Sequence, residues 1–156
     1  MKLFLKDSAA RRNQRSPEAF VEFPVAECHQ PIHHRFERQA ILYADAPAVR
    51  LVSGDITYAE LNAAANQAAR MLLTKVGADS RPIALVLNQS YESVLWPLAI
   101  LKAGLCYAPL DQRLPEHVLH AMVENLGPGA LIAGTRHQDA SRNIAAFAKL
   151  QLPKPW

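Results

Sequence analysis

The chain is poor in the residues that build covalent frameworks. It has two cysteines among 156 residues, Cys28 and Cys106, which are too few for the disulfide framework of a small secreted domain. Cys106 lies in an apolar, strand-like run, where a buried and reduced thiol is the usual state. We therefore expect a reducing compartment and a buried Cys106.

Long apolar runs are missing as well. The best candidate, residues 94–101, contains Pro97 and ends at Lys102, well short of the roughly 20 residues that a membrane-spanning helix needs. The apolar start, residues 1–5, is followed at once by charged residues, so that no export signal is evident. We expect a cytoplasmic protein with no membrane association.

The net charge is small. It amounts to +3, and its visible cluster, Arg11, Arg12 and Arg15, lies in a polar stretch near the N-terminus. A nucleic-acid-binding domain would show a basic stripe with interleaved aromatic residues or a known docking motif, and neither appears. Because 50% of the residues are hydrophobic and 20% are charged, we expect a folded globular domain without a nucleic-acid partner.

The sequence also has no recognisable catalytic signature. It contains no G-x-S-x-G elbow, no H-E-x-x-H motif, no P-loop lysine pattern and no paired carboxylates at a suggestive spacing. Its one glycine-rich spot, residues 127–129, precedes a predicted strand, whereas phosphate-cradling loops follow a strand and open a helix. From the residues alone we assign no catalytic, cofactor-binding or metal-binding residue.

Three other places in the sequence are candidate sites. Cys28, His29, His33 and His34 fall within seven residues, but structural zinc sites draw on two separated ligand pairs, so we prefer surface histidines at a helix start to a zinc site. Lys102 at a helix end is explained by the helix dipole and by a stem that covers apolar surface. Asp111 follows a strand at the edge where open α/β sheets bind ligands, and it is therefore a site candidate.

Regular structure is predicted from about residue 29 onward. Residues 1–28 show no sustained period and are interpreted as a tail or an interdomain linker. A helix is predicted after Pro31, and a hairpin over residues 48–57 with a turn at 53–55. Thr57 and Glu60 have the spacing of a capping box, which predicts a helix to about Lys75 with an apolar face formed by Leu61, Ala65, Ala68 and Leu72.

The rest of the chain alternates between strand and helix patterns. Strands are predicted over residues 82–87, 105–110 and 130–133, and helices over 90–104, 115–126 and 140–150. We predict a kink at Pro97, because a proline inside a helix removes a hydrogen bond and clashes with the preceding turn. The alternation predicts an α/β fold with a mainly parallel sheet, flanking helices and a small β-hairpin near the start.

Three segments together resemble the opening of an adenylate-forming (AMP-binding) domain of the nonribosomal peptide synthetase type. Residues 33–40 resemble the family's H-E-L-F-E-x-Q-A segment, residues 56–62 its T-Y-x-E-L-N motif and residues 101–111 its L-K-A-G-x-x-Y-x-P-L-D motif. Residues 45–49 are similar to its P-D-A-x-A-V segment. The sequence departs from the family at Gln112, where proline is usual, at Pro97, and over residues 151–156.

The resemblance implies an incomplete N-terminal subdomain, residues 29–156, of an enzyme that joins an amino or carboxylic acid to AMP. Mg-ATP is the co-substrate of the complete family domain. The family's S-G-T-T-G-x-P-K-G phosphate loop and its C-terminal catalytic lysine have no counterpart in this sequence, so the resemblance implies neither a cofactor nor catalysis for this chain alone.

Two hypotheses follow for a chain of this kind. One is a truncated adenylation domain of secondary metabolism, inactive alone, that is a gene remnant or one piece of a split enzyme. The other is a non-catalytic interaction module, which docks onto other adenylation or synthetase modules, or onto itself, through an exposed sheet edge.

Overall fold

The structure is a computed structural model, and it describes residues 24–77, 79–111 and 113–133. The chain divides into two compact units, Met1–Gln30 and Pro31–Trp156. The described part of the first unit holds a short 3₁₀ helix, η2 (Val25–His29). The division of the chain into residues 1–28 and 29–156 stays a prediction, and the helix predicted over residues 140–150 lies outside the described residues.

The second unit opens with a helix and a hairpin. Helix α1 (Ile32–Leu42) follows Pro31, as predicted, and the antiparallel strands β1 (Pro47–Leu51) and β2 (Gly54–Thr57) come next. The turn lies at residues 52–53, one residue earlier than predicted, because Gly54 already pairs with Leu51. Gly54 has a φ of +136°, a conformation that glycine adopts more readily than other residues.

Helix α2 (Tyr58–Val76) begins with the predicted capping box. The Thr57 hydroxyl oxygen accepts a hydrogen bond of 3.2 Å from the backbone N–H of Glu60, and the Glu60 carboxylate accepts one of 2.8 Å from the backbone N–H of Thr57. These bonds satisfy two backbone donors that a helix start would otherwise leave free. The predicted apolar face is confirmed, since all four of its residues are buried: Leu61, Ala65, Ala68 and Leu72.

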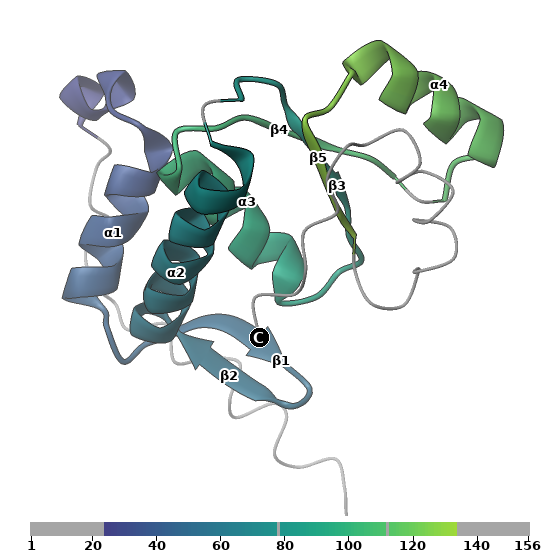
Figure 1. The fold of residues 1–156 in the computed structure, drawn as a ribbon. Coiled ribbons are helices and arrows are strands. Elements are labelled where there is room, and N and C mark those ends of the chain that lie inside the picture. Colours follow the sequence, from purple (N-terminus) through teal and green to yellow (C-terminus); the bar gives the residue numbers. More distant parts are fainter. Residues whose placement is uncertain (1–23, 78, 112, 134–156) are drawn as a thin grey trace, which may run out of the picture. The chain divides into compact units, whose positions relative to one another are not determined.

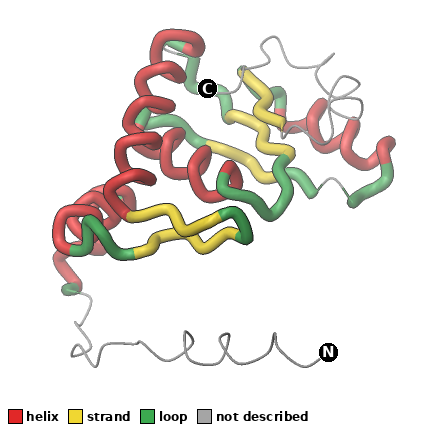
Figure 2. The backbone as a smooth tube through the Cα atoms, turned by 90° about the horizontal axis from the view of Figure 1, so that it is seen from below, coloured by secondary structure: helices red, strands yellow, loops and turns green. Residues whose placement is uncertain are grey.

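Three parallel strands form the second sheet. Strands β3 (Ile83–Val86), β4 (Tyr107–Pro109) and β5 (Ala130–Ala133) lie in the order β4-β3-β5. They are joined by helices α3 (Glu92–Lys102) and α4 (Glu116–Leu126), so the predicted α/β alternation is confirmed. The hairpin and this sheet are separate, as the strands in Figure 2 show.

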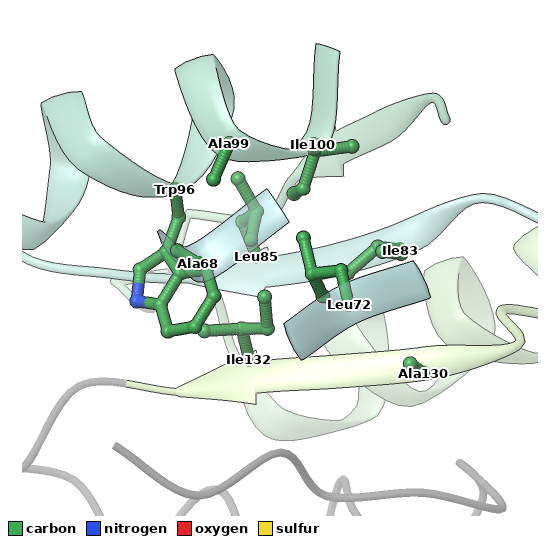
Figure 3. Packing of buried hydrophobic residues seen from close by; sticks show 9 residues of the cluster. All are labelled: Ala68, Leu72, Ile83, Leu85, Trp96, Ala99, Ile100, Ala130 and Ile132. Atoms are coloured by element: carbon green, nitrogen blue, oxygen red, sulfur yellow. The ribbon is translucent and has the colours of Figure 1, made fainter. Parts of the chain in front are cut away.

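Helices cover both faces of the parallel sheet. Successive side chains of β3 point to opposite faces, so Ile83 and Leu85 face α2 and α3, whereas Ala84 and Val86 face α4. Figure 1 shows α2 and α3 side by side, with α4 on the other side of the strands. Figure 3 shows the first of these two clusters, in which Trp96 of α3 packs near Ile132 of β5.

Two predictions in this region have different outcomes. Helix α3 continues through Pro97 from Glu92 to Lys102, and the kink there stays a prediction. The prediction that Cys106 is buried was wrong, because its thiol is free and exposed. Strand β4 begins at Tyr107, directly after Cys106, and is therefore shorter than the strand predicted over residues 105–110. Among the described strands β4 has β3 as its one neighbour, which leaves the start of β4 uncovered.

No helix within the described ranges is both long enough and apolar enough to cross a membrane.

Candidate functional site

The carboxyl edge of the parallel sheet is where an open α/β fold places its ligand crevice. Residues 87–91 follow β3 and lead into α3, and Leu110 and Asp111 follow β4. Leu110 remains attached to the sheet, since its backbone N–H donates a hydrogen bond of 2.8 Å to the carbonyl of Leu85. The structure therefore places Asp111, the predicted site candidate, directly at this edge.

The Asp111 carboxylate is already hydrogen-bonded to Arg113, two residues further along the chain. Its Oδ1 accepts hydrogen bonds of 3.0 Å from the backbone N–H and from the Nε of Arg113, and its Oδ2 accepts one of 2.7 Å from a terminal guanidinium nitrogen of Arg113. The Arg113 side-chain bonds lower the pKa of Asp111 to about 2. The carboxylate is thus ionised at neutral pH, and much of its hydrogen-bonding capacity is used.

The glycine-rich residues 127–129 do not form a phosphate loop. Phosphate loops follow a strand and open a helix with free backbone N–H groups. The glycine-rich residues 127–129 instead precede β5: Gly127 ends α4 in the left-handed conformation, and the backbone N–H of Gly129 donates to the carbonyl of Pro82 at 3.0 Å. This is the turn that the sequence predicts, and it lies at the amino end of the strands rather than at their carboxyl end.

The histidine-rich stretch is divided between the two compact units. Cys28 and His29 belong to η2, whereas His33 and His34 lie in the first turn of α1 and pack edge to face with ring centroids 4.6 Å apart. Burial, the charge of His34 and the charge of Lys102 lower the pKa of His33. Within the described ranges, no group of three or more His, Cys, Asp or Glu side chains could hold a metal ion.

A partly buried ion pair is the feature that the sequence did not predict. The side chain of Lys102 at the end of α3 is 4% exposed, and its Nζ donates a hydrogen bond to Oε1 of Glu37 in α1. The same Nζ lies 6.0 Å from the centre of the Phe36 ring. Lys102 therefore does more than cover apolar surface at a helix end, because it joins two helices that are 65 residues apart in the sequence.

The two charges of this pair have unequal surroundings. The Glu37 side chain is 39% exposed, whereas the Lys102 side chain is 4% exposed. The hydrogen bond from Lys102 is the main cause that lowers the pKa of Glu37, and burial opposes it. Glu37 lies in the segment 33–40 and Lys102 in the segment 101–111, and nothing in the sequence indicates that the two residues touch.

Most of the chain is similar to known proteins. The AMP-binding enzyme family matches residues 36–154. The dimodular nonribosomal peptide synthase of Bacillus subtilis (strain 168) is 33% identical over 127 residues, which are 81% of this chain and 5% of that protein. The chain therefore spans a small part of the length of this relative.

Two solved structures share the fold. A fatty acyl CoA synthetase of Mycobacterium tuberculosis has a TM-score of 0.69 and 24% identity, and the match covers 78% of this chain and 26% of that one. The NpsA N-terminal subdomain of Klebsiella oxytoca, in complex with 3-hydroxyanthranilyl-AMSN, has a TM-score of 0.62 and 22% identity, covering 66% of this chain and 26% of that one. The α/β architecture is thus that of the N-terminal subdomain of adenylate-forming enzymes.

Proposed function

Because this chain belongs to the AMP-binding enzyme family, and to its nonribosomal peptide synthetase adenylation type, we propose that its residues serve as the N-terminal scaffold of an adenylation domain. The complete domain would activate an amino or carboxylic acid as an acyl adenylate with Mg-ATP in secondary metabolism. We propose a cytoplasmic location, in keeping with two free cysteines.

We further propose that the 156 residues do not form an adenylate by themselves. The observation that carries this proposal is that the glycine-rich residues 127–129 precede β5, whereas a phosphate loop follows a strand and opens a helix. Adenylate formation depends on positioning and on electrostatic stabilisation of phosphoryl charge, and a glycine-rich phosphate loop supplies much of that. In the family that loop lies downstream of the motifs present here.

Amino-acid-dependent ATP–pyrophosphate exchange tests the catalytic part of this proposal. The purified chain is assayed with pools of amino acids and aryl acids, and we expect exchange at the level of a buffer blank. Calorimetry with Mg-ATP should show no stoichiometric binding. Exchange clearly above the blank, or stoichiometric nucleotide uptake, would contradict the proposal.

A chimera tests the scaffold part. Residues 36–133 replace the matching segment of an adenylation domain of the Bacillus subtilis relative, and we expect exchange with that domain's own acid to be retained at a reduced rate. The intact relative is the positive control. A chimera that folds, as shown by circular dichroism, but has no exchange would indicate that this chain does not supply an equivalent scaffold.

A second candidate function is that of an interaction module or of one piece of a split enzyme. Strand β5 pairs with β3 and with no second strand among the described residues, and the free edge of a strand is a template for pairing with another chain. The partner would be another adenylation or synthetase module, or a second copy. Light scattering across a concentration series, together with co-purification with a separately expressed downstream segment of a related domain, tests this. A monomer that captures no such segment would exclude it.

A further inference from the structure

Helix α1 packs on the rest of its unit with little apolar burial of its own. Among its eleven residues Ala40 is the one that is buried, and Phe36 is half-buried against the cluster around Leu61. The other large apolar side chains of the helix point away from that cluster: Ile32 is 72%, Ile41 78% and Leu42 69% exposed. Burial of apolar area therefore contributes less to the docking of α1 than it does for α2 or α3.

The ion pair lies on the docked face of this helix. Glu37 is one position from Phe36 and three from Ala40, and it reaches Lys102, whose side chain is 4% exposed. The charged groups that act on Glu37 are Lys102 of α3 and His33 and His34 of α1. Of these, Lys102 is the one that donates a hydrogen bond to the Glu37 carboxylate.

The two charges respond differently to the loss of the partner. An ammonium group that is buried without a counter-ion is strongly unfavourable, and removing one partner of a buried pair is costly for this reason. Lys102 would regain water if α1 moved away, because α1 carries both its counter-ion Glu37 and the Phe36 ring, whose centre lies 6.0 Å from its Nζ. Glu37 needs no such movement, since its carboxylate is already partly hydrated.

We propose that α1 is a conditionally docked helix, and that Lys102 makes its docking depend on a carboxylate at position 37. With the carboxylate in place, Lys102 is neutralised and α1 stays on α2 and α3. Without it, α1 detaches locally while the parallel sheet and its helices remain folded. α1 is the first element of its unit, so its detachment would free the connection to the preceding residues without unfolding the sheet.

Hydrogen exchange measured by mass spectrometry on the full chain tests this proposal. In Glu37→Gln, amides of α1 should exchange at least about tenfold faster than in the wild type, with α2 and β3 unchanged. In Lys102→Met, α1 should exchange at nearly the wild-type rate, because an apolar side chain of similar length fills the site and Glu37 remains hydrated. The double variant Glu37→Gln/Lys102→Met should restore the protection that Glu37→Gln loses.

The restoration separates conditional docking from ordinary stabilisation. If the pair were simply one more favourable contact, the double variant would be no better than Glu37→Gln. Glu124→Gln on the exposed side of α4 is the matched control, and it should leave α1 exchange unchanged. The proposal fails if α1 is unprotected in the wild type, if Glu37→Gln accelerates α2 and β3 as much as α1, or if the double variant does not recover.

Discussion

Gly129 lies so close to Asp79 that a side chain at position 129 would collide with the Asp79 carboxylate unless one of them shifts. A Cβ at position 129 would lie 2.7 Å from Oδ2 of Asp79 and 3.3 Å from the Cβ of Arg81. Asp79 is held in place because its Oδ1 accepts hydrogen bonds from the backbone N–H and the Nε of Arg81, at 3.0 and 2.9 Å. The amino ends of β3 and β5 meet here, where Gly129 donates its backbone N–H to Pro82.

Gly129→Ala should therefore lower the free energy of unfolding by about 1–3 kcal/mol, the usual cost of an added methyl group in a packed site. Urea unfolding followed by circular dichroism measures it. The control is the same substitution in an Asp79→Ala background, where the methyl group has room and the cost should shrink. An equal cost in both backgrounds would show that the contact with Asp79 is not the cause.

The capping box predicts a second stability change. Thr57→Ala removes the acceptor for the backbone N–H of Glu60 and should cost about 1 kcal/mol, whereas Thr57→Ser keeps the hydroxyl and should cost much less. Thermal unfolding of the two variants gives the comparison. If alanine and serine were equally destabilising, packing of the Thr57 methyl group would be responsible instead of the hydrogen bond.

The contribution of the same capping box to stability depends on pH. The hydrogen bonds that Thr57 donates lower the pKa of Glu60 in the folded chain. A depressed folded pKa means that the carboxylate contributes stability above its ordinary pKa, and that this contribution is lost as the pH falls through the folded value. Thr57→Ala removes the hydroxyl donor and should reduce the loss of stability on acidification, which denaturant titrations at several pH values would measure.

Local signals in the sequence predicted most of this fold. Four apolar residues after a glycine turn predicted β5 at its observed bounds, and the spacing of Thr57 and Glu60 predicted the start of α2. The contact between Lys102 and Glu37 could not be predicted, because it joins separate elements and leaves no periodic pattern. The prediction that Cys106 is buried failed for a related reason, since exposure at the start of a strand depends on which neighbouring strands the sheet provides.

Two adjacent leucines of α2 test the orientation of that helix. Leu72 is fully buried against the sheet, whereas Leu73 is 48% exposed. Leu72→Ala should cost about 2–5 kcal/mol, because it removes buried atoms and leaves a cavity, while Leu73→Ala should cost less than about 1 kcal/mol. Both variants have the same change in helix propensity, so the difference in urea midpoint reports burial alone. Similar midpoints would contradict the placement of α2 on the sheet.

The pairing of Asp111 with Arg113 can be tested by titration. Arg113→Gln removes the guanidinium that holds the pKa of Asp111 at about 2, so the pKa should rise toward its ordinary value of 3.8. Because the folded pKa is depressed, the contribution of Asp111 to stability is present above its unfolded pKa and is lost as the pH falls toward 2. Carboxyl carbon chemical shifts measured by NMR follow the protonation of Asp111 directly.

The control is Arg81→Gln, which opens the similarly built pair at Asp79 and should leave the titration of Asp111 unchanged. A pKa that stays near 2 in Arg113→Gln would mean that another group, and not this arginine, stabilises the carboxylate at the edge of the sheet.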